Sequence, residues 1–143
     1  GPTPRDIVAN MAFYVGLTHE LSCQSKALEE SITFTDCKEN FYKCAQKGLA
    51  ADIVWLGKKL KVQELLLDQL IPMAKNGLEK LNISFSDIQL YINETIYPRV
   101  LNGQNGSHWQ RAYIGCHGRD FQGMSQRYWE QQKENIPVHS WSI

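Results

Sequence analysis

The segment from Gly106 to Gln132 concentrates the side chains that ligand sites and active sites use most. All lysines except Lys133 precede residue 81, whereas all arginines except Arg5 follow residue 98. Arginine presents a planar fork suited to carboxylates, phosphates and aromatic faces, and lysine is a solvated point charge. We therefore expect a binding face in residues 106–143 and a scaffold before it. The candidate ligand-binding residues are His108, Arg111, His117, Arg119, Arg127 and His139.

Two of these arginines suggest an anion site. On a helix, Arg119, Gly123 and Arg127 follow each other at four-residue spacing and share one face. A glycine between two guanidinium groups leaves a notch that can hold a carboxylate, phosphate or sulfate by two-point hydrogen bonding. The alternative is an ordinary helical pair between Arg127 and Glu130.

A catalytic hypothesis uses the pair His117 and Asp120, assisted by Arg119 or Arg127, as in a small hydrolase or lyase. Such chemistry needs a nucleophile or base that a further group orients. Cys116 beside His117 does not meet this need, because adjacent helical residues do not face each other. The sequence contains none of the patterns GxxxxGK, GxGxxG, HExxH and GxSxG. We expect no cofactor and no metal.

The cysteines are Cys23, Cys37, Cys44 and Cys116. An even number without CxxC spacing is typical of two disulfides in an exported protein. Cys37 and Cys44 lie roughly 10 Å apart along a helix, which is too far for a disulfide. We therefore expect Cys23–Cys44 and Cys37–Cys116, with the swapped pairing as the alternative. Four reduced thiols are a further alternative.

A zinc site built on Cys37, Cys44 and either His117 or His19 is a weaker possibility, because the close ligand spacing of such sites is missing. Asn82, Asn93 and Asn105 begin glycosylation patterns, which favours a secreted or periplasmic/extracellular glycoprotein. Gly1-Pro2 is typical of the remnant of a cleaved tag.

Composition limits the function classes. The chain has 43% hydrophobic and 21% charged residues, which is typical of a folded protein, and its formal net charge is zero. A zero charge disfavours bulk binding to nucleic acid and broad attraction to anionic membranes. The sequence has no run of apolar residues long enough to span a membrane.

Helical periodicity dominates, and strand signals are scarce. The apolar spacing and capping residues predict a single-domain, all-α bundle of about five or six helices over residues 3–143. The second helix includes Cys37 and continues through Trp55, and Lys58, Lys59 and Lys61 form a solvated helix end. The predicted helices are residues 4–28, 36–55, 62–81, 85–98, 108–116 and 119–134.

Two features concern packing. Gly48 and Ala51 lie on one face of the predicted second helix, where they would allow a neighbouring helix to approach closely. That face is the basis of an alternative hypothesis, a homodimeric structural subunit. At the other end, the extended tail carries the large apolar residues Ile136, Val138, Trp141 and Ile143, so we expect it to pack back on the last two helices.

The sequence HGRDFQGMSQRYW, residues 117–129, resembles the third-helix region of SANT/Myb-like modules. The regular tryptophan spacing and the basic excess of those modules are missing, so their DNA or histone binding is not transferred. The sequence favours an exported, effector-like helical protein that binds a protein surface or a small anionic ligand through residues 106–143.

Overall fold

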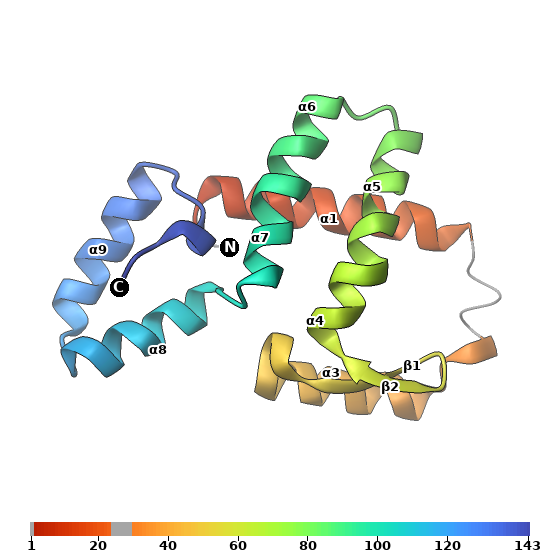
Figure 1. Cartoon of the computed structure of the whole chain (residues 1–143), viewed down its shortest axis with the longest axis horizontal. Coiled ribbons are helices and arrows are strands. Elements are labelled where there is room, and N and C mark those ends of the chain that lie inside the picture. Colours follow the sequence, from red (N-terminus) through yellow and green to blue (C-terminus); the bar gives the residue numbers. More distant parts are fainter. Residues whose placement is uncertain (1, 24–29) are drawn as a thin grey trace. The chain divides into compact units, whose positions relative to one another are not determined.

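The computed structural model describes residues 2–23 and 30–143. This part of the chain is mostly helical, as predicted, with one two-stranded sheet (Figure 1). The part of the first predicted helix at residues 24–28 lies outside the described residues. The helices and strands are α1 (Pro4–Ser22), α3 (Phe34–Lys47), β1 (Asp52–Trp55), β2 (Lys58–Lys61), α4 (Val62–Leu65), α5 (Ile71–Lys80), α6 (Phe85–Ile88), α7 (Tyr97–Leu101), α8 (Gly106–His117) and α9 (Phe121–Lys133).

The chain forms two compact units, each with its own core. The central unit is Tyr14–Ile83, and the terminal unit combines Gly1–Phe13 with Ser84–Ile143. One domain over residues 3–143 stays a prediction. A cluster of buried residues in the central unit contains Ala51, Ile53 and Leu65, and one in the terminal unit contains Trp109, Tyr113, Val138 and Trp141.

A β-hairpin replaces the second half of the predicted second helix. The prediction of a helix through Trp55 is wrong, because α3 ends at Lys47 and a two-residue turn joins two strands. Leu56 and Gly57 both have positive φ, 48° and 76°, which suits the right-handed twist of a tight hairpin. The antiparallel register pairs Asp52 with Lys61, Ile53 with Leu60, Val54 with Lys59, and Trp55 with Lys58.

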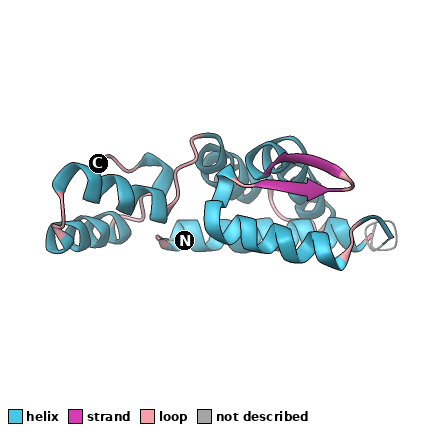
Figure 2. Ribbon diagram, turned by 90° about the horizontal axis from the view of Figure 1, so that it is seen from below, coloured by secondary structure: helices cyan, strands magenta, loops and turns pink. Residues whose placement is uncertain are grey.

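The hairpin lies along α3, and Asn40 joins the two (Figure 2). The Asn40 amide donates to the Val54 carbonyl oxygen at 2.6 Å, and the Val54 N–H donates to Asn40 Oδ1 at 2.9 Å. One side chain thus satisfies both backbone groups at this position of β1. An unpaired strand edge is a risk for aggregation, and this contact covers part of it.

The close helix contact expected at Gly48 and Ala51 is not formed there. Ala51 is fully buried in the core of its own unit, and Gly48 follows the end of α3, so the predicted dimer face does not exist as a helical surface. Within the central unit, α1 and α5 instead meet at Gly16 and Gly77. A Cβ on Gly77 would overlap the backbone carbonyl of Gly16, and a Cβ on Gly16 that of Ala74.

Two prolines each follow a π-helical segment. Leu66–Leu70 precedes Pro72, and Gln89–Ile96 precedes Pro98. Proline lacks an N–H and its ring clashes with the carbonyl one turn earlier, so a wider turn before it relieves both problems. The helix therefore continues past Pro98 to the end of α7, rather than ending at the proline.

Local sequence signals define α8 and α9. The side chain of Asn105 caps α8 by accepting the His108 N–H at 2.9 Å, and Gly118 follows its last residue with a φ of 66°. Asp120 Oδ1 accepts the Gly123 N–H at 2.9 Å and caps α9. These bonds satisfy N–H groups that a helix start leaves without an intrahelical partner.

The C-terminal segment packs on α8 and α9, with a 3₁₀ turn at Val138–Ser140 (Figure 1). Trp141 is 4% exposed, and its ring centroid lies 5.1 Å from those of Trp109 and Tyr128, both edge-to-face. The indole N–H of Trp109 donates to the Ser142 carbonyl oxygen at 2.9 Å. The burial expected for Trp141 is confirmed.

Candidate functional site

The candidate ligand-binding residues lie on the terminal unit, but their contacts differ. His117 and Arg127 both contact Tyr113, whereas His139 lies in the 3₁₀ turn near Asp6 and Arg99. His139 is half-buried. The exposed members of the set are His108, Arg111, His117, Arg119 and Arg127.

Tyr113 organises the surface around the end of α8. Its hydroxyl donates to Asp120 Oδ2 at 3.3 Å, and its ring stacks on His117 with 4.2 Å between centroids. The guanidinium carbon of Arg127 lies 6.0 Å from the same ring. Burial raises the pKa of Tyr113, and the charge of Asp120 and its hydrogen bond raise that pKa further. Tyr113 is thus a neutral hydrogen-bond donor that holds this surface together.

The predicted anion notch at Gly123 is filled. A Cβ on Gly123 would overlap the carboxylate of Asp120 and approach the hydroxyl of Tyr113. A carboxylate therefore occupies the space beside Gly123, and it repels another anion at short range. Arg119 lies before the start of α9, so it does not share a helical face with Gly123 and Arg127 as predicted. The geometry gives no support to an anion held between these two arginines.

His117 and Asp120 bond to different partners. The Nδ1 atom of His117 lies 3.2 Å from the Tyr113 carbonyl oxygen, and Asp120 is engaged as the cap of α9. A base and the group that orients it need a direct hydrogen bond. In the described part of the chain no hydrogen bond or ion pair joins these two residues, so the geometry does not support the hydrolase or lyase hypothesis.

An apolar groove lies on the surface of α8 and α9. Met124 and Tyr128 are half-buried and pack on the core of the terminal unit, and Trp129 beside them is 59% exposed. The groove has a volume of about 210 Å³. No charged side chain belongs to its lining, which consists of Gln110, Met124, Ser125, Tyr128, Trp129 and Gln132.

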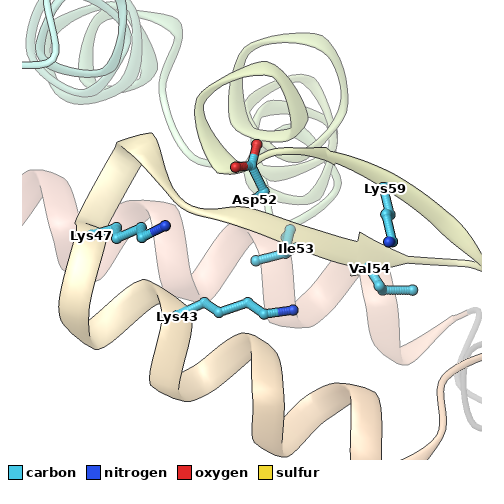
Figure 3. Close-up of a pocket in the computed structure, with 6 residues that line it drawn as sticks. All are labelled: Lys43, Lys47, Asp52, Ile53, Val54 and Lys59. Carbon is cyan, nitrogen blue, oxygen red and sulfur yellow. The ribbon is translucent and has the colours of Figure 1, made fainter.

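A second pocket, in the central unit, involves residues that the sequence did not single out. Lys43 and Lys47 of α3 and Lys59 of β2 line a cavity of about 190 Å³ (Figure 3). The sequence placed Lys59 at a solvated helix end, because the hairpin was not recognised. The hairpin could have been predicted from Leu56-Gly57, a possible two-residue turn that follows a stretch of β-favouring residues.

A buried ion pair joins the first helix to α7 in the terminal unit. Asp6 is fully buried and lies 2.5 Å from Arg99, which also donates to Asn10 Oδ1 at 2.6 Å. Asp6 accepts further hydrogen bonds from Thr3 and from the Val138 N–H. The pKa of nearby His139 is lowered, first by burial and then by the charge of Arg99. These interactions stabilise the packing of three segments and engage both carboxylate oxygens of Asp6.

The predicted disulfides are wrong. Cys23, Cys37, Cys44 and Cys116 are free thiols, and all but the half-buried Cys44 are exposed. Burial raises the pKa of Cys44. Both Cys37 and Cys44 lie in α3, where Cys44 packs on the core of the central unit and Cys37 faces solvent. The disulfide argument for export therefore no longer holds.

Residues 2–23 and 30–143 contain no group of three His, Cys, Asp or Glu side chains placed to hold a metal ion. Among these residues, no helix has both the length and the apolar character needed to cross a membrane. No family model matches the chain, and neither a curated protein nor a solved structure matches it.

Proposed function

We propose that the protein is a helical binding protein that engages a protein partner through the α8–α9 surface of its terminal unit. The observation that carries the proposal is Trp129, a large aromatic side chain that is 59% exposed next to the groove formed with Met124 and Tyr128. Tryptophan is among the residues that contribute most to binding at protein interfaces.

The lining of the groove favours a peptide segment over a small ion. Its apolar residues can enclose one aliphatic side chain, and the amides of Gln110 and Gln132 can both donate and accept hydrogen bonds with a peptide backbone. An anion would find no cation among the lining residues. Of the two ligand classes expected from the sequence, the groove therefore favours the protein surface.

The scaffold supports the groove rigidly. Tyr128 stacks edge-to-face on Trp141, and Trp109 lies 6.2 Å from Tyr128 between ring centroids. A preformed surface loses little conformational freedom on binding, which favours affinity. The ammonium group of Lys133 lies 5.2 Å from the ring centroid of Trp129 and favours that ring position further.

A peptide-display selection against the folded chain tests the proposal. Selected peptides should bind the wild-type chain saturably and lose about tenfold or more in affinity for Trp129→Ala, since such anchors contribute at least 2 kcal/mol. Phe34→Ala is the matched control, because Phe34 is an aromatic residue that is 83% exposed on the central unit. The proposal would be contradicted if no peptide were enriched, or if the selected peptides bound Trp129→Ala and Phe34→Ala with the same affinity.

A further inference from the structure

We propose that the pocket of Lys43, Lys47 and Lys59 in the central unit binds a phosphate group, free or as the monoester of a small molecule. The pocket is formed by α3 and the hairpin, and its other lining residues are Asp52, Ile53 and Val54 (Figure 3). Its residues belong to the central unit, so the inference does not depend on the function proposed for α8 and α9.

The walls of the pocket are fixed by the fold. The two hydrogen bonds between Asn40 and the backbone of Val54 set the spacing of α3 and β1. Ile53 is 6% exposed and packs in the core, which holds the strand from behind. The lysine side chains are flexible, but the backbone positions that carry them are therefore held in place.

Positive groups outnumber negative groups in the pocket. The lining carries three ammonium groups and one carboxylate, in a chain whose formal net charge is zero. In Figure 3 the carboxylate of Asp52 points away from the ammonium groups of Lys43 and Lys47. A concave surface lined mainly by positive charges raises the local concentration of anions.

Competition from the protein's own carboxylates is weak. Lys43 lies 3.6 Å from Glu39, one turn earlier, and both side chains are largely exposed, so this pair contributes little and can be exchanged for a ligand. Within the described ranges, neither Lys47 nor Lys59 has an ion-pair partner. Lys47 lies in the last turn of α3, where a cation also favours the helix dipole. The helix dipole therefore explains why a lysine stands at position 47, but it does not explain the lysine at position 59, which lies on a strand.

The chemistry of the pocket favours phosphate over a carboxylate. Lysines act as point charges, and several of them suit the doubly charged, three-oxygen surface of a phosphate group. The half-buried Val54 lines the same space, where it can contact the organic part of an ester.

The test is a titration with inorganic phosphate and with phenyl phosphate at constant ionic strength, followed by amide NMR shifts of the whole chain. We expect saturable shifts confined to the backbone of the pocket. Lys59→Gln should weaken binding about tenfold, the effect of losing one charge-assisted hydrogen bond. Lys58→Gln is the matched control, because it removes the same charge one residue earlier, at an exposed position that does not line the pocket.

Tighter binding of phenyl phosphate would support the monoester as the ligand, and equal binding would support free phosphate. Shifts that grow linearly without saturation, or that map elsewhere, would overturn the proposal. Equal losses of phosphate affinity in Lys58→Gln and Lys59→Gln would overturn it too, because they would indicate diffuse electrostatic attraction of phosphate instead of a defined site. Trp129→Ala should leave the titration unchanged, which separates this inference from the proposed protein binding.

Discussion

Asp6 and Arg99 are 93 positions apart in the sequence and form an ion pair at 2.5 Å, with the carboxylate fully buried. Arg99→Ala should lower the free energy of unfolding by about 3–5 kcal/mol, because Asp6 would remain as a buried charge without its partner. Denaturation by urea measures this. The exposed Arg111→Ala should change stability by only about 0.5 kcal/mol.

The double variant Asp6→Ala with Arg99→Ala separates the pair from its surroundings. The double variant should lose less free energy of unfolding than the two single variants together, since removal of both partners leaves no unpaired charge. Additive losses would mean that the two residues stabilise the terminal unit independently.

The contact of α1 with α5 depends on Gly16 and Gly77. Gly77→Ala should destabilise the central unit by about 1–3 kcal/mol or more, because the added methyl group overlaps the backbone of Gly16. Gly115→Ala is the control, since its added Cβ would face open space in α8. At that position the better helix propensity of alanine should stabilise the protein by a few tenths of a kcal/mol up to about 1 kcal/mol. Thermal melts of both variants test the contrast.

Trp141 should contribute strongly to stability. Trp141→Ala is expected to cost about 3–5 kcal/mol, as for other buried aromatic residues, and Trp129→Ala about 0.5 kcal/mol or less, because Trp129 is exposed. Deletion after Asn135 should lower the melting temperature at least as much as Trp141→Ala. An unchanged melting temperature would show that the tail does not pack on α8 and α9 in solution.

The pH dependence of stability should reflect His139. Its pKa lies below the usual 6.5 in the folded chain, because burial and Arg99 disfavour the charged imidazole. Below pH 6.5 the unfolded chain therefore takes up a proton first, and stability falls until the pH passes the lowered pKa. His139→Gln should reduce this loss, measured by urea unfolding at pH values from 7 downwards. His108→Gln, at an exposed position of α8, should not.

The thiols should differ in reactivity. Without reductant, an alkylating reagent should modify Cys23, Cys37 and Cys116 of the native protein rapidly and Cys44 slowly, because burial protects Cys44 and raises its pKa. Mass spectrometry after timed quenching measures the order. A protein that is labelled only after reduction would contain disulfides and contradict the structure.

The local parts of the fold could be predicted from the sequence. Asn105 and Asp120 cap α8 and α9, and Gly118 separates them, because each of these residues acts on backbone groups within a few positions of itself. The burial of Trp141 was also predictable, since a large aromatic side chain gains much by leaving water. The same local signals placed His108, Arg111 and Arg127 on the correct helices, whereas Arg119 lies before α9 and His117 is the last residue of α8.

The hairpin and the lysine pocket were not predictable in this way. Residues 52–61 contain apolar spacing compatible with a helix, and the strands exist because Ile53 packs in the central core and Asn40 pairs with the backbone of β1. Lys43 and Lys59 become neighbours only through that packing. Likewise, Gly123 follows a helical pattern that predicts a notch, but the side chains of Tyr113 and Asp120 fill it.

The sequence by itself determined the helical character of the chain, the caps of its last two helices and the burial of its C-terminal tryptophan. The tertiary structure alone decided which face of α1 is buried. There Ile7 and Met11 are exposed, whereas Asp6 and Ala9 are covered. The physical reason is that a capping hydrogen bond, or the tendency of an apolar side chain to be buried, depends on residues close to it in the sequence. The partner of a buried charge, such as Arg99 for Asp6, comes from a distant part of the sequence and is fixed only when the chain packs.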